Sequence, residues 1–354
     1  MTASTPRPLP LTTWQKFKRL KRGYYSFNIL IILIVLSCFA ELIFNSKALF
    51  VSYQDEWYWP VFSPAIEGKQ FGLDYEYETN YRQLKKYFAQ QGQSTDSNNF
   101  VILPLVPYNA TEVDLNNGVY PPHPPSVATQ HYLGTDTIGR DVLVRLVYGF
   151  RIAIFFALTL LVVEYVIGVF IGCFMGFRGG LFDLFFQRII EIWSNIPFLY
   201  IVMIMSSLIT PGFWSLVMIM ALFGWMSMTW YMRSASYKEA NRDYVVAAQM
   251  MGASNFRIIY KHIIPNTVST IITFVPFSVA GGITALTALD FLSFGLPAPA
   301  PSWGELLKQG VDNLEYPWII SSVVIALSFV LMLVTFIGEA IREIFDPKHK
   351  IYYE

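Results

Sequence analysis

The chain has 354 residues, of which 54% are hydrophobic and only 14% are charged, and its 25 basic residues balance its 25 acidic residues. A soluble domain carries about 25% charged residues, so this composition excludes an ordinary soluble protein and indicates long apolar segments. Both cysteines, Cys38 and Cys173, fall in apolar runs, which excludes a disulfide framework in a soluble part. No basic block beyond the N-terminal region indicates a nucleic-acid partner, and none is expected.

Apolar runs long enough to cross a bilayer recur along the chain. Crossing about 30 Å of hydrocarbon takes roughly 20 apolar residues in a helix. The pattern predicts an all-α, polytopic protein in contact with membrane lipid, with transmembrane helices over residues 27–44, 150–177, 189–209, 213–232, 268–292 and 318–338. Pro197 and Pro276 fall inside two of these segments, which packed transmembrane helices tolerate. No signal-peptide cleavage pattern follows Ala40, so we interpret the first run as a retained anchor.

Basic residues predict the orientation of these spans, because they concentrate in cytoplasmic loops. The first 26 residues contain several lysines and arginines and no acidic residue, which places the N-terminus in the cytoplasm. Arg140, Arg145 and Arg151 depart from the rule, since they precede the second span on the outer side; long outer segments translocate largely regardless of charge. The predicted parts are a cytoplasmic segment, a first helix, an outer insertion, a five-helix transmembrane core and a cytoplasmic tail, over residues 1–26, 27–44, 45–149, 150–340 and 341–354.

The outer insertion, residues 45–149, is the only sizeable soluble part. It is aromatic and acidic over residues 57–59 and 74–78, and its proline run at 121–125 predicts an extended strap. The polar stretch 90–99 is expected to be flexible. We weigh two interpretations equally: a lid of irregular loops on the membrane domain, and a docking surface for a partner.

The most informative stretch is residues 243–266, which the topology places in the cytoplasm and which we call the elbow. Its sequence predicts two short helices separated by a glycine. Asp243 can cap the first helix, Gly252 suits the left-handed conformation just past its end, and Ser254 can cap the second. Pro265 is expected to close the second helix before the next span.

The side chains of the elbow suit a docking role. Ala247 and Ala248 form a small-residue patch that lets another surface approach closely. Met250 and Met251 supply adaptable apolar side chains. A helical elbow that offers such side chains outward suits docking into the groove of a partner protein. The alternative interpretation is an ordinary amphipathic surface loop.

The same stretch resembles the EAA loop of ABC importer permeases, in which a glutamate and two alanines precede a glycine and, further on, a proline. Val246 and Ile264 stand where the glutamate and the residue before the proline belong, which weakens only a role for the glutamate itself. In that family the loop, residues 233–265 here, holds the coupling helix that sits in a cleft of the ATPase subunit. The matching residues are Ala247, Ala248, Gly252 and Pro265.

Two further stretches resemble the C-type permease subunits of bacterial dipeptide and oligopeptide ABC importers. Residues 132–149 are similar to the LGTDxxGRDVLxRLxYG signature and predict a capped turn that leads into the second span, and residues 290–304 resemble the family's outer loop after the fifth span. Segments 49–53 and 60–62 look like the branch of microcin C-type peptide importers. The resemblance implies a type I permease of the bacterial inner membrane that pairs with a second permease subunit, cytoplasmic ATP-binding subunits and a periplasmic peptide-binding protein.

Buried ionisable residues are candidates for a translocation path. Glu164 lies in the middle of the second span, where a carboxylate costs several kcal/mol unless it faces a cavity or a partner, or is neutral. We weigh a path residue and a protonated or hydrogen-bonded helix contact equally. Asp290 is a weaker path candidate, because it can simply reach the membrane interface. Gly168, Gly172 and Gly176 form a small-residue stripe that is expected to pack helices.

No phosphate-binding loop of the form G-x-x-x-x-G-K-[ST] occurs, so a separate chain is expected to hydrolyse ATP and this chain is not expected to be an enzyme. The scattered histidines give no metal-ligand spacing, and neither a metal nor a cofactor is expected. The predicted function is inward translocation of oligopeptides or peptide conjugates by alternating access. Alternatives are a permease for another solute such as dipeptides or nickel and a secondary transporter, which would usually show an internal repeat. A third is a membrane-anchored receptor or assembly factor whose outer segment does the work, which would leave the elbow unexplained.

Overall fold

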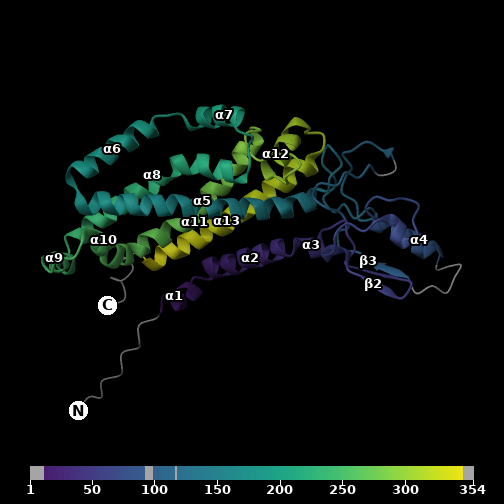
Figure 1. Cartoon of the computed structure of the whole chain (residues 1–354), viewed down its shortest axis with the longest axis horizontal. Coiled ribbons are helices and arrows are strands. Elements are labelled where there is room, and N and C mark those ends of the chain that lie inside the picture. Colours follow the sequence, from purple (N-terminus) through teal and green to yellow (C-terminus); the bar gives the residue numbers. More distant parts are fainter. Residues whose placement is uncertain (1–11, 92–98, 116–117, 346–354) are drawn as a thin grey trace, which may run out of the picture. The chain divides into compact units, whose positions relative to one another are not determined.

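A computed structural model describes residues 12–91, 99–115 and 118–345 (Figure 1). These residues are mostly helical, which confirms the all-α class. Within them, five helices are long and apolar enough to cross a membrane, and a bent helix pair can supply a sixth crossing. The long helices are α2 (Lys21–Cys38), α5 (Val142–Arg178), α8 (Phe213–Ala240), α11 (Ile264–Phe291) and α13 (Pro317–Phe345).

Two helix starts differ from the predicted spans. Helix α5 begins at Val142, inside the predicted outer insertion, because Asp141 caps it by accepting a hydrogen bond from the backbone N–H of Val144 at 2.8 Å. The first span is α2, and the short helices α1 (Thr13–Arg19) and α3 (Ala40–Ile43) flank it.

The chain divides into a first unit (Met1–Ile31, Ile154–Leu286 and Ser328–Glu354) and a second unit (Ile32–Ala153 and Thr287–Leu327).

The prediction of one continuous helix over 189–209 is wrong. Two helices, α6 (Gly180–Ser194) and α7 (Phe198–Leu208), occupy this region and meet at an angle of 75°. Pro197 lies at the break, where it has no N–H to donate and disfavours helical geometry at the residue before it. The crossing is therefore a broken helix.

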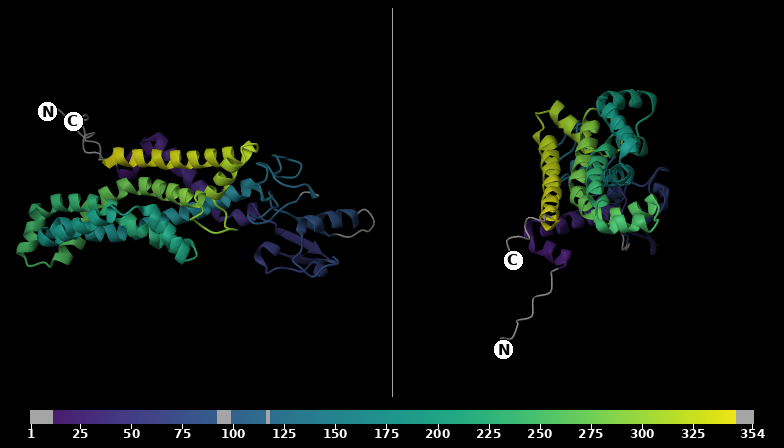
Figure 2. Two further views of the ribbon diagram at one scale, coloured as in Figure 1. Left: turned by 90° about the horizontal axis from the view of Figure 1, so that it is seen from above. Right: turned by 90° about the vertical axis from the view of Figure 1, so that its left-hand side faces the viewer.

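The long helices of the first unit are drawn from two further sides in Figure 2. Among them, α5 and α8 pack in parallel through the predicted glycine stripe. A Cβ added at Gly168 would stand 2.7 Å from the backbone oxygen of Trp225, and one at Gly172 would stand 2.5 Å from that of Thr229. Along these contacts the residue numbers increase together on α5 and α8, so the two helices run in the same direction. The chain must return between them, and hence α6 and α7 together make one crossing, which supports the six-span prediction.

Helix α11 runs antiparallel to α5. The hydroxyl of Tyr165 lies 2.8 Å from Ser278 Oγ, and a Cβ on Gly282 would stand 3.0 Å from Ala157. Between these helices and the elbow lies an apolar core of buried side chains. Its members are Tyr165, Val169, Cys173, Met228, Met232, Val245, Ala248, Ile258, Ile259 and Ile263.

The outer insertion, which belongs to the second unit, is not only a set of irregular loops. It contains a sheet in the order β2-β1-β3, in which β1 (Phe50–Tyr53) pairs antiparallel with β2 (Glu56–Tyr58) and β3 (Phe100–Ile102). Helix α4 (Tyr81–Gln91) covers a small core with the buried side chains of Val51, Phe71, Tyr81, Leu84 and Phe88. The strands are too short to display a periodic pattern, so the lid interpretation missed them.

The rest of the insertion has little regular structure. Two 3-10 turns, Pro60–Phe62 and Gly68–Phe71, precede α4. The proline run at 121–125 forms neither helix nor strand. Most of the stretch expected to be flexible, residues 92–98, lies outside the described residues. Helix α12 (Trp303–Asp312) completes the second unit.

Candidate functional site

A cavity of about 250 Å³ lies among α5, α8 and α11 of the first unit. The polar side chains in its lining are Glu164, Tyr165, Ser227, Tyr231 and Ser278. Glycines lie on its wall as well, so the helix backbones leave room there. The cavity thus combines an apolar wall with a few polar groups, which is the usual character of a small-molecule site.

Glu164, the predicted path residue, faces this cavity from α5. Its carboxylate lies against the backbone of Gly224 on α8, where any Cβ would overlap the carboxylate. Within the described part of the chain, no hydrogen bond or ion pair reaches the Glu164 carboxylate. Its role in transport stays a prediction, but its position is that of a lone carboxylate in a cavity.

A second hollow of about 320 Å³ lies nearer to the elbow, between the last turns of α8 and the first turns of α11. Tyr231 lines both hollows. Its ring stacks on that of Phe274, which lines the first cavity, with ring centroids 3.8 Å apart. The stacked pair therefore lies between the two hollows.

The turn between the two helices of the elbow has the predicted conformation. Helices α9 (Asp243–Met250) and α10 (Asn255–Ile258) are separated by Gly252, whose φ of +78° is the left-handed conformation that favours glycine. Ser254 caps α10, because its Oγ accepts a hydrogen bond from the backbone N–H of Arg257 at 3.4 Å. Both features confirm the predicted roles of these two residues.

Two other assignments in the elbow are wrong. Asp243 is the first residue of α9 and not its cap; Arg242 takes that place without a side-chain hydrogen bond, and the Asp243 carboxylate only adds a favourable charge in the first turn. Pro265 does not end a helix. The backbone N–H of Ile264 bonds to the oxygen of Ile259 in a π-turn, Ile259–Ile263, and this wider turn lets the chain pass through Pro265 into α11.

The two alanines of the elbow face opposite ways. Ala247 is exposed, whereas Ala248 is only 4% exposed and packs in the apolar core of the first unit, so the prediction of an outward patch is wrong for Ala248. Consecutive residues of an α-helix point in directions about 100° apart, so Ala247 can face outward while Ala248 faces the core.

The elbow exposes four large apolar side chains among polar and charged ones such as Asp243, Arg257 and Lys261. Met250 and Met251 are 86% and 82% exposed, as predicted. Phe256 and Tyr260 are each 59% exposed and lie one turn apart with parallel rings. The sequence interpretation missed these two rings, although their spacing of four residues was the available signal.

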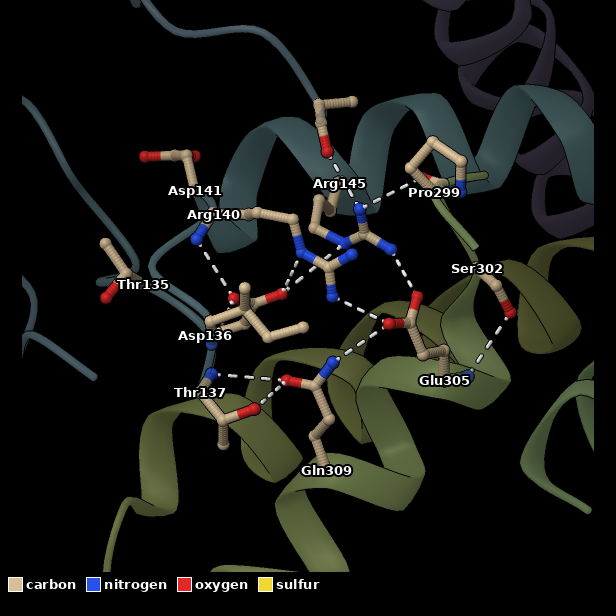
Figure 3. A network of polar contacts seen from close by, with 12 residues as sticks. Thr135, Asp136, Thr137, Arg140, Asp141, Arg145, Pro299, Ser302, Glu305 and Gln309 are labelled. Atoms are coloured by element: carbon tan, nitrogen blue, oxygen red, sulfur yellow. Dashed lines mark hydrogen bonds and ion pairs between the residues drawn. The ribbon is translucent and has the colours of Figure 1, made fainter. Parts of the chain in front are cut away.

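An ion-pair network in the second unit explains the arginines that departed from the charge rule (Figure 3). Asp136 accepts hydrogen bonds from the backbone N–H of Arg140 at 2.9 Å and from its Nε at 2.7 Å. Arg140 Nη2 reaches Glu305 Oε1 of α12 at 2.6 Å, and Arg145 Nη2 bonds to the other oxygen of Glu305. Arg151 pairs separately with Glu41 at 2.7 Å. Each of these positive charges is therefore neutralised by a carboxylate.

Arg145 is the centre of this network. It is fully buried, and its Nη1 donates to the backbone oxygen of Ala110 at 2.8 Å while Nη2 lies 3.3 Å from that of Ala300. The predicted capped turn is present, with Gly139 at a φ of +98°. The signature 132–149 therefore ties the insertion to the loop before α12, which is a structural role.

Asp290, the weaker path candidate, lies in the last turn of α11, directly before the loop that leads to α12. Its carboxylate accepts hydrogen bonds from the backbone N–H of Leu296 at 2.7 Å and from Ser302 Oγ at 2.5 Å. Its side chain is buried. These contacts favour a role in ordering residues 291–302.

The sequence has clear relatives among known proteins. Residues 168–351 match the family described as "Binding-protein-dependent transport system inner membrane component". The chain is 40% identical over 346 residues to the inner membrane ABC transporter permease protein YejE of Escherichia coli K12, covering 97% of this chain and 98% of that protein. It is 37% identical over 363 residues to the peptidoglycan transport system permease protein YejE of Agrobacterium fabrum, covering 96% and 93%. It is 32% identical over 242 residues to the oligopeptide transport system permease protein OppC of Bacillus subtilis, covering 68% and 78%.

Proposed function

The chain belongs to the family of binding-protein-dependent transport system inner membrane components, and we propose that its elbow couples ATP hydrolysis to the movement of the transmembrane helices. The chain is a multi-pass permease subunit of an ABC peptide importer in the bacterial inner membrane and not an enzyme. It works with a second permease, separate ATP-binding subunits and a substrate-binding protein.

The observation that carries the coupling role is the exposed apolar surface of the elbow. The exposed side chains are those of Met250 in α9, Met251 in the turn after it, Phe256 in α10 and Tyr260 in the π-turn that follows. Such a surface is costly to leave in water and suits burial in the groove of an ATP-binding subunit. Behind it, Val245 and Ala248 pack into the core that contains α5 and α8. A displacement of the elbow would therefore be transmitted through this core to the helices that surround the cavity.

We also propose that the cavity among α5, α8 and α11 lies on the translocation path. Glu164 gives it a carboxyl group, and Tyr231 and Phe274 separate it from the hollow nearer to the elbow. For Asp290 we propose a structural role in the outer loop, because both of its carboxylate oxygens already accept hydrogen bonds.

The coupling role can be tested with charged substitutions on the elbow. The double variant Met250→Asp, Met251→Asp should insert in the membrane but lose the ATP-binding subunits on purification, and ATP-driven uptake of a labelled tetrapeptide should fall at least about tenfold. Leu314→Asp is the matched control, since Leu314 is also an exposed apolar residue (70%) but lies outside the elbow. Full uptake by the double variant with normal ATPase binding would show that the elbow does not couple.

A further inference from the structure

The cavity among α5, α8 and α11 holds a carboxylate that the chain itself leaves unmatched. Glu164 lies in an apolar transmembrane helix, yet no described residue donates a hydrogen bond or a positive charge to it. A carboxylate in a membrane is expected to face a cavity, a partner or a substrate. The surrounding helices keep the cavity open beside it, and they supply no counter-ion.

The walls of the cavity are shaped around this carboxylate. Gly224 lets it lie directly against α8, because a side chain at residue 224 would collide with it. Gly281 of α11, which also lines the cavity, leaves open space, since a Cβ there would meet no atom within 4 Å. The remaining lining is mostly apolar, but it includes the hydroxyl groups of Ser227 on α8 and of Ser278, whose Oγ lies 2.8 Å from the hydroxyl of Tyr165.

We propose that this cavity binds one primary ammonium group of the transported peptide, with Glu164 as its counter-ion; the inference rests on the proposed role of the cavity in peptide import. An ammonium group has three donors and no acceptor, so it can bond to the carboxylate and to the hydroxyl oxygens at the same time. A metal ion would need several anionic or neutral ligands, and Glu164 is the only carboxylate among the cavity residues. The N-terminal amine or a lysine side chain of the cargo provides the group.

The test compares two peptides in the complete importer, with its second permease, ATP-binding subunits and binding protein, reconstituted in proteoliposomes. One alanine tetrapeptide has a free N-terminus and the other is N-acetylated. The measured quantity is the ratio of their ATP-driven uptake rates in each variant relative to wild type. The binding protein is identical throughout, so its own preference cancels in this comparison.

Glu164→Gln should lower the preference for the free amine by about tenfold and leave uptake of the acetylated peptide unchanged. Gly224→Ala should act in the same direction, because its methyl group displaces the carboxylate. Glu191→Gln is the matched control: Glu191 is an exposed carboxylate of α6 that pairs with Arg188 outside the cavity. It should keep the wild-type ratio.

Three results separate this inference from the function on which it rests. If wild type takes up neither peptide with ATP, the peptide-import function itself fails. If wild type transports but Glu164→Gln keeps the preference, or loses both peptides equally, the ammonium site is refuted and the import function stands. Loss of the second permease from the purified Glu164→Gln complex would also refute it, because Glu164 would then serve the subunit contact.

Discussion

The backbone of Gly172 on α5 lies so close to α8 that a Cβ on residue 172 would stand 2.5 Å from the carbonyl oxygen of Thr229. Real side chains do not approach a backbone oxygen to this distance, and a helix backbone cannot move aside alone. We expect Gly172→Ala to force the helices apart and to lower the free energy of unfolding by about 1–3 kcal/mol. Thermal unfolding of the purified complex measures the loss.

Gly281→Ala is the matched control for this prediction. A Cβ at residue 281 would meet no atom within 4 Å, although Gly281 also lies inside a transmembrane helix. Its melting temperature should stay at or slightly above that of wild type, since alanine is the better helix former. Equal destabilisation by both substitutions would mean that the glycine stripe is not a packing surface.

A second prediction concerns the ion pair between the buried Arg145 and the partly buried Glu305. Glu305→Ala leaves the fully buried guanidinium of Arg145 without its main counter-ion, and breaking such a pair costs about 3–5 kcal/mol. We expect faster proteolysis of the outer insertion and a lower melting temperature. Glu76→Ala, which breaks the exposed pair with Lys69, should change the free energy of unfolding by less than about 1 kcal/mol. Similar proteolysis of the two variants would rule out the proposed structural role.

The long helices could be predicted from the sequence because hydrophobic length alone decides them, but the effect of each proline could not. Pro276 is buried within α11 and the helix continues through it, since neighbouring helices hold it in place. Pro197 is exposed, and the helix breaks there. Only the tertiary packing distinguishes the two.

In the candidate site, too, features that depend on neighbouring residues could be predicted, whereas contacts between residues far apart in the sequence could not. The conformation of Gly252 and the cap at Ser254 depend on adjacent residues, and both were predicted. The pairing of Arg145 with Glu305 joins residues that lie 160 positions apart, so no local pattern could indicate it. The cavity that Glu164 faces likewise needs three helices, so from the sequence only the presence of a carboxylate in an apolar segment was evident.

A pH dependence is expected from His131 of the second unit. Its Nδ1 lies 2.7 Å from Asp141 and its Nε2 3.3 Å from Asp114, and its ring stacks on Tyr108. Burial lowers the pKa of His131, but the hydrogen bonds and charges of Asp114 and Asp141 outweigh burial and raise the pKa above the ordinary 6.5. The protonated ring therefore stabilises the fold below that ordinary pKa, and the stabilisation is lost as the pH rises through the raised value.

The check is the melting temperature of wild type and His131→Gln across about pH 5.5 to 8.5. Wild type should lose stability with rising pH more steeply than the variant. His262→Gln, a histidine of the elbow, is the control and should keep the wild-type slope. Parallel curves for wild type and His131→Gln would exclude the contribution of this histidine.

The stacked rings of Tyr231 and Phe274 should act as a barrier between the two hollows. Phe274→Ala removes one ring, so the hollows should merge and passive efflux of a labelled peptide from nucleotide-free proteoliposomes should rise several-fold. Phe185→Ala truncates an exposed phenylalanine of α6 and should leave efflux unchanged. Unchanged efflux in the Phe274→Ala variant would show that the stacked rings are not a barrier on the proposed path.

The turn at Gly252 offers a sharp test of the elbow, because a substitution there changes only the preferred backbone conformation. Its φ is +78°, yet a Cβ would meet no atom within 4 Å, so a substitution strains the backbone without a clash. Valine is strongly disfavoured at a positive φ, whereas asparagine adopts the left-handed conformation more readily.

We therefore expect Gly252→Val to insert normally but to reduce ATP-driven peptide uptake, since a distorted turn shifts α10 and its exposed Phe256 relative to α9. Gly252→Asn should keep most of the uptake. Membrane insertion, retention of the ATP-binding subunits and uptake are measured on both variants. If valine and asparagine transport equally well, the geometry of this turn does not matter for coupling, and the surface formed by α9 and α10 cannot be the rigid element that transmits the motion of the ATPase.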